Sequence, residues 1–196
     1  MNQALDHLKR DLVLAGLIRN HKVPKWSKSK NLFASLCAEI IGQQLSGRAR
    51  DVLYERLVKS FGASGFPTAE QILKKPNQKV RDVGLSWAKV KYLKNLSFAV
   101  VAGQVDFSEI KKLPDDVVSQ KLTAVKGIGP WTAEMFLMFT LGRPDVFSIG
   151  DLGIRKAISK LYNVRSGNHK KMIQIAENWR PYRSLACRYL WASLDE

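Results

Sequence analysis

Residues 122–135, Leu-Thr-Ala-Val-Lys-Gly-Ile-Gly-Pro-Trp-Thr-Ala-Glu-Met, form the stretch that decides the fold. The pattern predicts a helix that ends at Val125, a turn over residues 126–129, and a second helix that starts at Pro130, because proline suits the first helical turn. Glycine at positions 127 and 129 permits positive φ and a close approach of the backbone to another molecule. The stretch therefore predicts two helices joined by a tight glycine turn.

This turn has the chemistry of an anion site. The amides of Gly127, Ile128, Gly129 and Trp131 are expected to point outward at the start of a helix, where an anion binds well, and Lys126 adds a positive charge. Such a turn can hold one phosphate of a nucleic acid without reading its sequence. The alternative is a helix–helix turn in which the glycines serve geometry alone. The turn by itself favours that alternative, whereas the charge of the chain and its downstream motifs favour phosphate.

Helical periodicity continues along nearly the whole chain, in about ten segments whose apolar residues recur every three or four positions. No convincing run shows the alternation of a strand. The expected helices cover residues 4–19, 32–44, 47–61, a short segment capped by Thr68, 76–83, 86–101, 115–125, 131–141, 151–162, 169–179 and 181–194. We therefore predict an all-α protein with two helical lobes, roughly residues 30–113 and 114–196. The N-terminal helix could return to pack with the second lobe, which the sequence leaves undecided.

Composition narrows the class of protein. The chain has 196 residues, with 32 Lys and Arg against 17 Asp and Glu, which gives a net charge of +15. This excess predicts a polyanionic partner, most simply nucleic acid, although a generally basic protein without such a partner is the alternative. Two distant cysteines exclude a disulfide framework, a zinc ribbon and a four-cysteine iron–sulfur site. Short apolar runs and a charged N-terminal segment predict an intracellular protein with no membrane span or secretion signal.

Taken in order, several segments resemble the helix-hairpin-helix–Gly/Pro–Asp superfamily of DNA glycosylases, and within it the 3-methyladenine DNA glycosylase II branch. The resemblance rests on residues 122–133, 145–156, 42–46, 84–93 and 179–186. It covers roughly residues 30–191 and implies a helix-hairpin-helix motif with a DNA-binding cleft between two lobes. Some members carry an additional N-terminal β-domain, for which this chain is too short and too helical.

The resemblance makes Asp151 the catalytic aspartate. A glycosylase breaks the C1′–N bond through a cationic sugar, and a fixed carboxylate stabilises that charge and can orient or deprotonate the attacking water. The alternative is that Asp151 simply caps the helix that follows it, a role compatible with catalysis. Asp145 is the nearest competing carboxylate, but it follows Pro144 in an expected turn and is expected to serve there.

Position 131 distinguishes two reaction classes within the superfamily. Branches that also cleave the strand resemble this segment but carry a lysine there, which acts as an amine nucleophile. This chain has Trp131 instead, and Lys126 lies on the turn, where it should face phosphate. We therefore predict an enzyme without lyase activity, which uses water and leaves an abasic site. The two-cysteine count also excludes the iron–sulfur branch.

The resemblance further implies a base pocket and a wedge. An alkylated purine is cationic, so stacked aromatic residues suit it, and Trp131 and Trp191 match aromatic pocket positions of the family. Met135 lies one turn after Trp131, where the family often has an aromatic residue, and this departure could shift substrate preference. For each, ordinary core packing is the alternative. Gln44 matches the side chain that fills the hole left by a flipped base, and Ser46 is expected at the minor groove.

Two further site predictions are weaker in the sequence itself. Lys89 is a candidate contact to DNA phosphate, as many surface lysines are. Family members can bind Na+ or K+ at carbonyls that correspond here to Thr123, Val125 and Ile128, although the sequence gives no evidence for the ion. Leu45 is the alternative wedge, and we expect no other cofactor.

The sequence therefore predicts a monofunctional DNA glycosylase that flips out 3-methyladenine, 7-methylguanine or ethenoadenine and hydrolyses the glycosidic bond. Its partner is double-stranded DNA with damaged bases. We expect a monomer, in the nucleoid of a bacterium or archaeon or in the nucleus of a eukaryote. One alternative is a non-catalytic helix-hairpin-helix DNA-binding protein, and another is a glycosylase for other damaged purines. Asp151, Gln44 and the aromatic positions favour the enzyme, because a pure binding module needs none of them.

Overall fold

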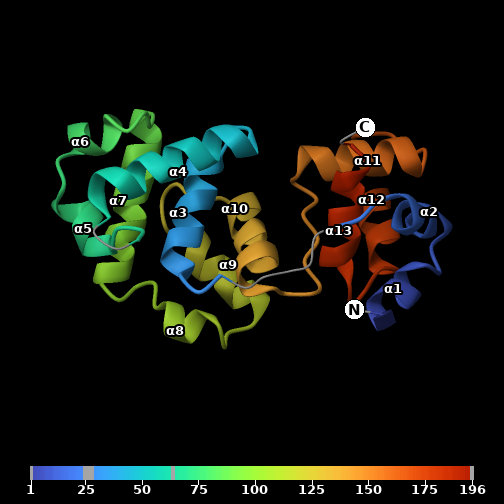
Figure 1. Ribbon diagram of the computed structural model, residues 1–196. Coiled ribbons are helices and arrows are strands. Elements are labelled where there is room, and N and C mark those ends of the chain that lie inside the picture. The colour runs from blue at the N-terminus through green and yellow to red at the C-terminus, as the bar shows by residue number, and fades with distance from the viewer. Residues whose placement is uncertain (1, 24–28, 63–64, 195–196) are drawn as a thin grey trace. The chain divides into compact units, whose positions relative to one another are not determined.

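A computed structural model describes residues 2–23, 29–62 and 65–194 of the chain, and Figure 1 shows the helices that they form. These residues contain helices and no strand, so the predicted all-α class is confirmed. They divide into two compact units. The described part of the central unit is residues 29–62 and 65–141. The described part of the terminal unit combines residues 2–23 with residues 142–194.

The central unit carries the glycine turn. Its helices are α3 (Leu32–Gly42), α4 (Gly47–Phe61), α5 (Ala69–Lys74), α6 (Asn77–Arg81), α7 (Trp87–Val101), α8 (Phe107–Ile110), α9 (Asp115–Thr123), α10 (Pro130–Met135) and the π-helix η1 (Phe136–Leu141). Helix α3 is the centre of this unit, because it packs against α4, α7, α10 and η1. Its side chains Leu36, Cys37, Ile40 and Ile41 are completely buried.

Local signals in the sequence explain where several of these helices begin. Thr68 forms a capping box with Gln71, in which each side chain pairs with the other residue's backbone amide. Ser86 caps α7 through the amide of Lys89. Helix α4 has the predicted bounds, and Pro130 occupies the first turn of α10 as expected.

The expected helix over residues 131–141 is only partly α-helical. After Met135 the backbone widens into the π-helix η1, which continues to Leu141. Helix α8 was not among the predicted helices, since its single turn is too short to show helical periodicity. Asp106 begins this turn by accepting hydrogen bonds from the amide and hydroxyl of Ser108.

The terminal unit is built from both ends of the chain. It contains α1 (Asn2–Leu8) and α2 (Leu12–Asn20) together with α11 (Leu152–Leu161), α12 (His169–Glu177) and α13 (Arg183–Ala192). Helix α13 packs against both α2 and α11. The boundary between the compact units thus follows Leu141, whereas the sequence placed it near residue 114. The reason is that α9 packs on α10 and η1, and these in turn pack on α3, which keeps all four in the central unit.

The single N-terminal helix predicted over residues 4–19 is wrong, because the helix breaks before Asp11. This side chain caps α2 by accepting hydrogen bonds from the amides of Val13 and Leu14. Its other carboxylate oxygen accepts from the Tyr162 hydroxyl and the Trp179 indole, both at 2.9 Å. One aspartate therefore ends the helical run and ties the N-terminal segment to the C-terminal part of the same unit. Among the described residues, no helix combines the length and the apolar character needed to cross a membrane.

Candidate DNA-repair site

The glycine turn joins α9 to α10, and α10 begins at Pro130 as predicted, whereas the first helix ends at Thr123 and not at the predicted Val125. The amide of Ile128 donates to the Val125 carbonyl at 3.0 Å to close the turn. Gly127 has φ +110, a conformation that glycine adopts without strain. A side chain at this position would also collide with the ring of Tyr92, whose nearest atom lies 2.2 Å from the place of a Cβ. Glycine is therefore required here both for φ and for the close approach of α7.

The turn is fixed by a side chain of α7, and two of its own residues are exposed. Asn95 of α7 donates to the Lys126 carbonyl at 2.9 Å. Lys126 and Gly129 are exposed, and a Cβ built on Gly129 meets no atom within 4 Å. Lys126 and Gly129 are thus accessible to a phosphate, as an anion site requires.

Two predicted phosphate contacts are engaged inside the protein. The amide of Ile128 donates to the Val125 carbonyl, and the Ile128 side chain is buried. The prediction that this amide points outward is therefore wrong. The Lys89 ammonium donates to the Ile41 carbonyl at 2.7 Å, at the end of α3. Partial burial of this ammonium lowers the pKa of Lys89. The amides of Gly127 and Gly129 and the ammonium of Lys126 remain the predicted phosphate ligands.

The predicted wedge lies at the corner between α3 and α4. Gln44 is exposed and has φ +59, a left-handed conformation that is uncommon for a residue with a side chain. Ser46 caps α4 by accepting a hydrogen bond from the amide of Ala49 at 3.3 Å. Leu45, the alternative wedge, is 40% exposed, so it is no core anchor. The corner thus presents Gln44 and Leu45 to solvent on adjacent positions.

Asp151 is the N-cap of α11 in the terminal unit, as the alternative interpretation expected. Its Oδ1 accepts hydrogen bonds from the amide of Ile154 at 2.8 Å and from the indole nitrogen of Trp191 at 2.9 Å. Gly153 lies between these two side chains, because a Cβ there would be 3.1 Å from Asp151 Oδ1 and from Trp191 Cδ1. The structure therefore brings together two of the predicted site residues, the carboxylate of Asp151 and the indole of Trp191. Gly153, whose role the sequence did not indicate, completes the arrangement.

Asp145 lies in a turn, as expected, and its carboxylate is bound by two arginines from the distant α13 region, which the sequence did not indicate. Arg183 donates from Nε to Asp145 Oδ1 at 2.7 Å, and Arg180 donates to Oδ2 at 2.6 Å. The Ser184 hydroxyl, beside Arg183, donates to the Arg143 carbonyl and accepts from the Val146 amide. The start of α13 thus fixes the loop that leads to Asp151. These contacts link positions about 40 residues apart, which is why sequence patterns did not reveal them.

The remaining predicted pocket residues lie on α10 of the central unit. Trp131 is half-buried in the first turn of α10. Met135, one turn later, is only 4% exposed, which is the environment of an ordinary core residue. Its role in a base pocket stays a prediction.

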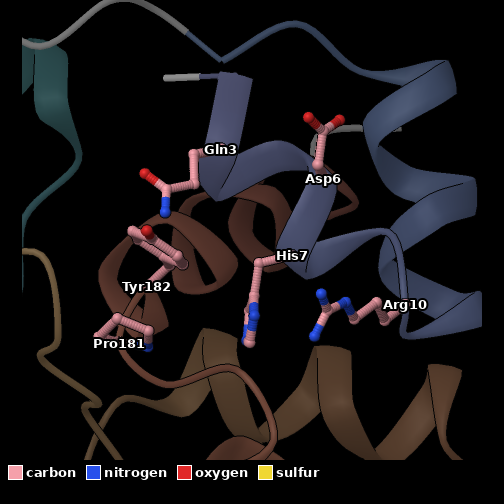
Figure 2. Close-up of a pocket in the computed structure, with 6 residues that line it drawn as sticks. All are labelled: Gln3, Asp6, His7, Arg10, Pro181 and Tyr182. Carbon is pink, nitrogen blue, oxygen red and sulfur yellow. The ribbon is translucent and has the colours of Figure 1, made fainter.

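Two hollows elsewhere contain none of the predicted site residues. One, of about 540 Å³, lies in the terminal unit, where Figure 2 shows Gln3 and His7 of α1 and Arg10 of the following turn lining a hollow with Pro181 and Tyr182. The other, of about 270 Å³, lies between α3, α4 and η1 in the central unit and is lined by Glu39, Arg50 and Tyr54 among others. Burial raises the pKa of the Glu39 carboxyl, and the nearby Arg50 acts in the opposite direction.

Comparison with known proteins identifies the family. Residues 37–181 match the model of the HhH-GPD superfamily of base excision DNA repair proteins. The chain belongs to this superfamily. DNA-3-methyladenine glycosylase 1 of Schizosaccharomyces pombe is 32% identical over 91% of the chain and 79% of its own length.

Solved structures of superfamily members agree with this assignment. A 3-methyladenine DNA glycosylase of Schizosaccharomyces pombe, in complex with abasic DNA, superposes with a TM-score of 0.90 at 28% identity and covers 99% of this chain and 97% of its own. A DNA-3-methyladenine glycosidase of Bacillus halodurans gives a TM-score of 0.80 at 37% identity, covering 94% and 85%. The predicted resemblance, and with it the type of enzyme, an N-glycosyl hydrolase, is confirmed.

Proposed function

We propose that this HhH-GPD protein is a monofunctional glycosylase for alkylated purines, which flips out 3-methyladenine, 7-methylguanine or ethenoadenine and leaves an abasic site. Its similarity to 3-methyladenine DNA glycosylases supports an alkylbase glycosylase of base excision repair. The observation that carries the proposal is the placement of Asp151, whose Oδ1 is fixed by the Ile154 amide and the Trp191 indole.

The fixed carboxylate suits hydrolysis of a glycosidic bond. As the base leaves, positive charge develops on the sugar, and a carboxylate that is already oriented stabilises this charge without reorganising. The same group can orient or deprotonate a water that attacks C1′. Alkylation at N3 or N7 makes the purine cationic, so the base departs without a strong general acid. Hydrolysis of such a nucleotide therefore needs one carboxylate beside the sugar and one pocket that accepts a cationic ring.

We propose that the enzyme lacks lyase activity, because of the residue that stands at position 131. Trp131 offers no amine nucleophile, and Lys126 lies exposed on the turn whose chemistry suits a phosphate. Water is then the nucleophile, and the strand stays intact after the base is released. Strand scission without added alkali would contradict this part of the proposal.

DNA binding is assigned to the central unit. The Lys126 ammonium and the amides of Gly127 and Gly129 are proposed to hold a backbone phosphate, and Gln44 to fill the hole left by the flipped base. Ser46 is proposed to contact the minor groove. Lys89 is proposed to contact a phosphate through the ammonium hydrogens that it does not donate to the Ile41 carbonyl. A DNA complex of a similar glycosylase supports the proposed partner. The proposed enzyme acts as a monomer, in a nucleoid or a nucleus.

A Na+ or K+ ion at the carbonyls of Thr123, Val125 and Ile128 belongs to the same proposal. These carbonyls lie at and just after the end of α9, where helix carbonyls lack intrahelical donors and the helix dipole favours a cation. The Val125 carbonyl accepts the Ile128 amide, which leaves its second lone pair for a cation. The donor set therefore fits an alkali ion. Replacing K+ by tetramethylammonium at constant ionic strength should weaken duplex binding.

The proposed activity is tested with duplexes that contain 7-methylguanine, 3-methyladenine or ethenoadenine, followed by alkaline cleavage of abasic sites. We expect release of at least one of these bases. Asp151→Asn should abolish most release while leaving the Kd for undamaged duplex unchanged, since the substitution removes the charge and keeps the cap. Unchanged release by Asp151→Asn would refute the role of this residue. No release by the wild-type protein would leave a DNA-binding module or a glycosylase for other purines.

A further inference from the structure

Gln43, the residue before the predicted wedge, makes the contact that joins the wedge corner to the glycine turn. Its side-chain amide nitrogen donates to the Gly127 carbonyl and to the Thr132 hydroxyl, each at 3.0 Å. The two acceptors lie on either side of the first residues of α10, one in the turn and one in the helix. Both belong to the central unit, as Gln43 does. The Gln43 side chain thus connects the corner that carries the proposed wedge to the turn that is proposed to hold a phosphate.

The corner that carries Gln44 is tight and braced. The amide of Leu45 donates to the Gly42 carbonyl at 3.0 Å, which closes the turn between α3 and α4. The Lys89 ammonium holds the Ile41 carbonyl from α7. The side chain of Arg50 covers Gly42 so closely that a Cβ there would lie 2.9 Å from Arg50 Cδ. Gln44 belongs to this corner and has φ +59, so the backbone of the corner sets the direction in which its side chain leaves the chain.

The hydrogen bonds of Gln43 show what the side chain can do. A glutamine amide has two donor hydrogens, and the Gly127 carbonyl and the Thr132 hydroxyl use both of them. The side chain has therefore no donor left for a DNA phosphate. It is also half-buried, whereas Gln44 beside it is exposed. The two adjacent glutamines thus have different environments, one bound within the protein and one facing solvent.

We propose that Gln43 is a positioning residue for base flipping, which sets the wedge Gln44 at a fixed place relative to the phosphate-holding turn. The inference rests on the proposed function, because it assigns a role in flipping. Gln43 acts on the wedge through the backbone that it shares with Gln44, and on the turn through the Gly127 carbonyl. In this proposal the phosphate contact at the glycine turn sets how deeply Gln44 enters the duplex, and the base leaves the stack only when Gln44 reaches that depth. Loss of the bridge should therefore impair flipping while the charge-based grip on DNA persists.

The test compares four variants: Gln43→Met, Gln44→Ala, the double variant, and Gln120→Met as a matched control on an exposed face of α9. Methionine keeps the length of glutamine and removes both donors. The measurements are single-turnover release of 7-methylguanine, the Kd for undamaged duplex, and the free energy of unfolding in urea. Gln43→Met should slow release about tenfold, as expected for two lost hydrogen bonds, and change the duplex Kd less than about twofold. Gln120→Met should behave as the wild type.

The double variant distinguishes positioning from general support of the fold. If Gln43 acts through the wedge, it has nothing left to position once Gln44 is truncated, so the double variant should release the base as slowly as Gln44→Ala and no slower. Losses that multiply would assign Gln43 to the fold alone and overturn the inference. Thr132→Val removes one acceptor and should give a smaller loss in the same direction, which keeps the test decisive if Gln43→Met does not fold.

Failure of the inference and failure of the proposed function give different results. Release of 7-methylguanine by the wild type together with an unaffected Gln43→Met variant overturns the role of Gln43 alone. If the wild-type protein releases no alkylated purine, the proposed function falls, and the flipping role of Gln43 falls with it.

Discussion

At the level of single residues, the hydrogen bond between Trp191 and Asp151 links two roles that the family resemblance treats separately. Trp191 matches a pocket position, where its ring would stack on a base. The structure shows its indole nitrogen donating to the carboxylate at 2.9 Å. The ring and the N–H group of one side chain can thus serve the base and the carboxylate, and substitutions can separate the two.

Trp191→Phe should reduce excision by orienting Asp151 less well, because phenylalanine keeps an aromatic ring and lacks the indole donor. A hydrogen bond to a charged group contributes about 1.5–3 kcal/mol, so single-turnover release should fall at least about tenfold. Trp191→Ala should lose more, since the ring is removed as well. Equal rates for Trp191→Phe and the wild type would show that the ring alone matters. The Kd for undamaged duplex should be the same in all three proteins.

Gln44 permits a second prediction at this scale, since its backbone is left-handed. A left-handed conformation costs a residue with a Cβ about 1–2 kcal/mol, and glycine is free of this cost. Gln44→Gly should therefore be more stable than Gln44→Ala by about 1 kcal/mol in urea unfolding, the reverse of the usual order. Both variants should lose excision to a similar extent, because both lack the wedge. A less stable glycine variant would contradict the strain at this position.

At the level of helices, the sequence located most of the elements whose signals are local. The bounds of α4, the capping box at Thr68 and the cap at Asp151 depend on residues within four positions of one another. The cap at Asp11 is also local but was missed, because apolar residues recur at helical spacing across it. The contacts of Asp11 with Tyr162 and Trp179, more than 150 positions away, leave no local pattern. In the site, the same distinction holds: the turn could be predicted, whereas the contacts of Gln43 and Arg183 connect distant segments.

Helix α3 provides a prediction about pH, because burial raises the pKa of Glu39 above its usual value of 4.5. The folded protein then holds this proton more tightly than the unfolded chain does. The group favours folding fully below about pH 4.5, and this contribution is lost as the pH rises through the folded pKa. Glu39→Gln, which stays neutral, should therefore be more stable than the wild type at pH 7 and no more stable at pH 4. Glu55→Gln, an exposed site on α4, should show no such difference.

At the level of the whole molecule, the charge of +15 gains a specific role. It suits sequence-independent attraction to DNA, to which a lysine contributes less when its ammonium is held by carbonyls of the protein. Lys94 is such a lysine, since its half-buried ammonium donates to the carbonyls of Ile72, Leu73 and Lys75 at the end of α5. Burial also lowers the pKa of Lys94. Net charge therefore overstates the number of lysines that are available to DNA.

Lys126→Ala should weaken duplex binding and reduce its dependence on salt. Each phosphate neutralised by a lysine contributes about −0.9 to the slope of log K against log salt concentration, so the slope should become shallower by about 0.9. The measurement is the Kd for undamaged duplex over a range of KCl concentrations. Lys75→Ala, which removes the ammonium that lies over the Phe61 ring, is the charge-matched control and should leave the slope nearly unchanged. Equal slopes for Lys126→Ala and the wild type would remove Lys126 from the phosphate site.

The terminal unit combines helices from both ends of the chain, whereas the central unit is continuous. During translation the ribosome therefore delivers every residue of the central unit before α11 to α13 emerge. At about 5–20 residues per second, α1 and α2 wait about 7–30 seconds for Tyr162 and Trp179, the partners of Asp11. Nascent chains arrested in this interval should already protect the central unit from protease while α1 and α2 remain cleavable. The order of synthesis thus completes the proposed phosphate-binding turn before Asp151, the proposed catalytic carboxylate, emerges.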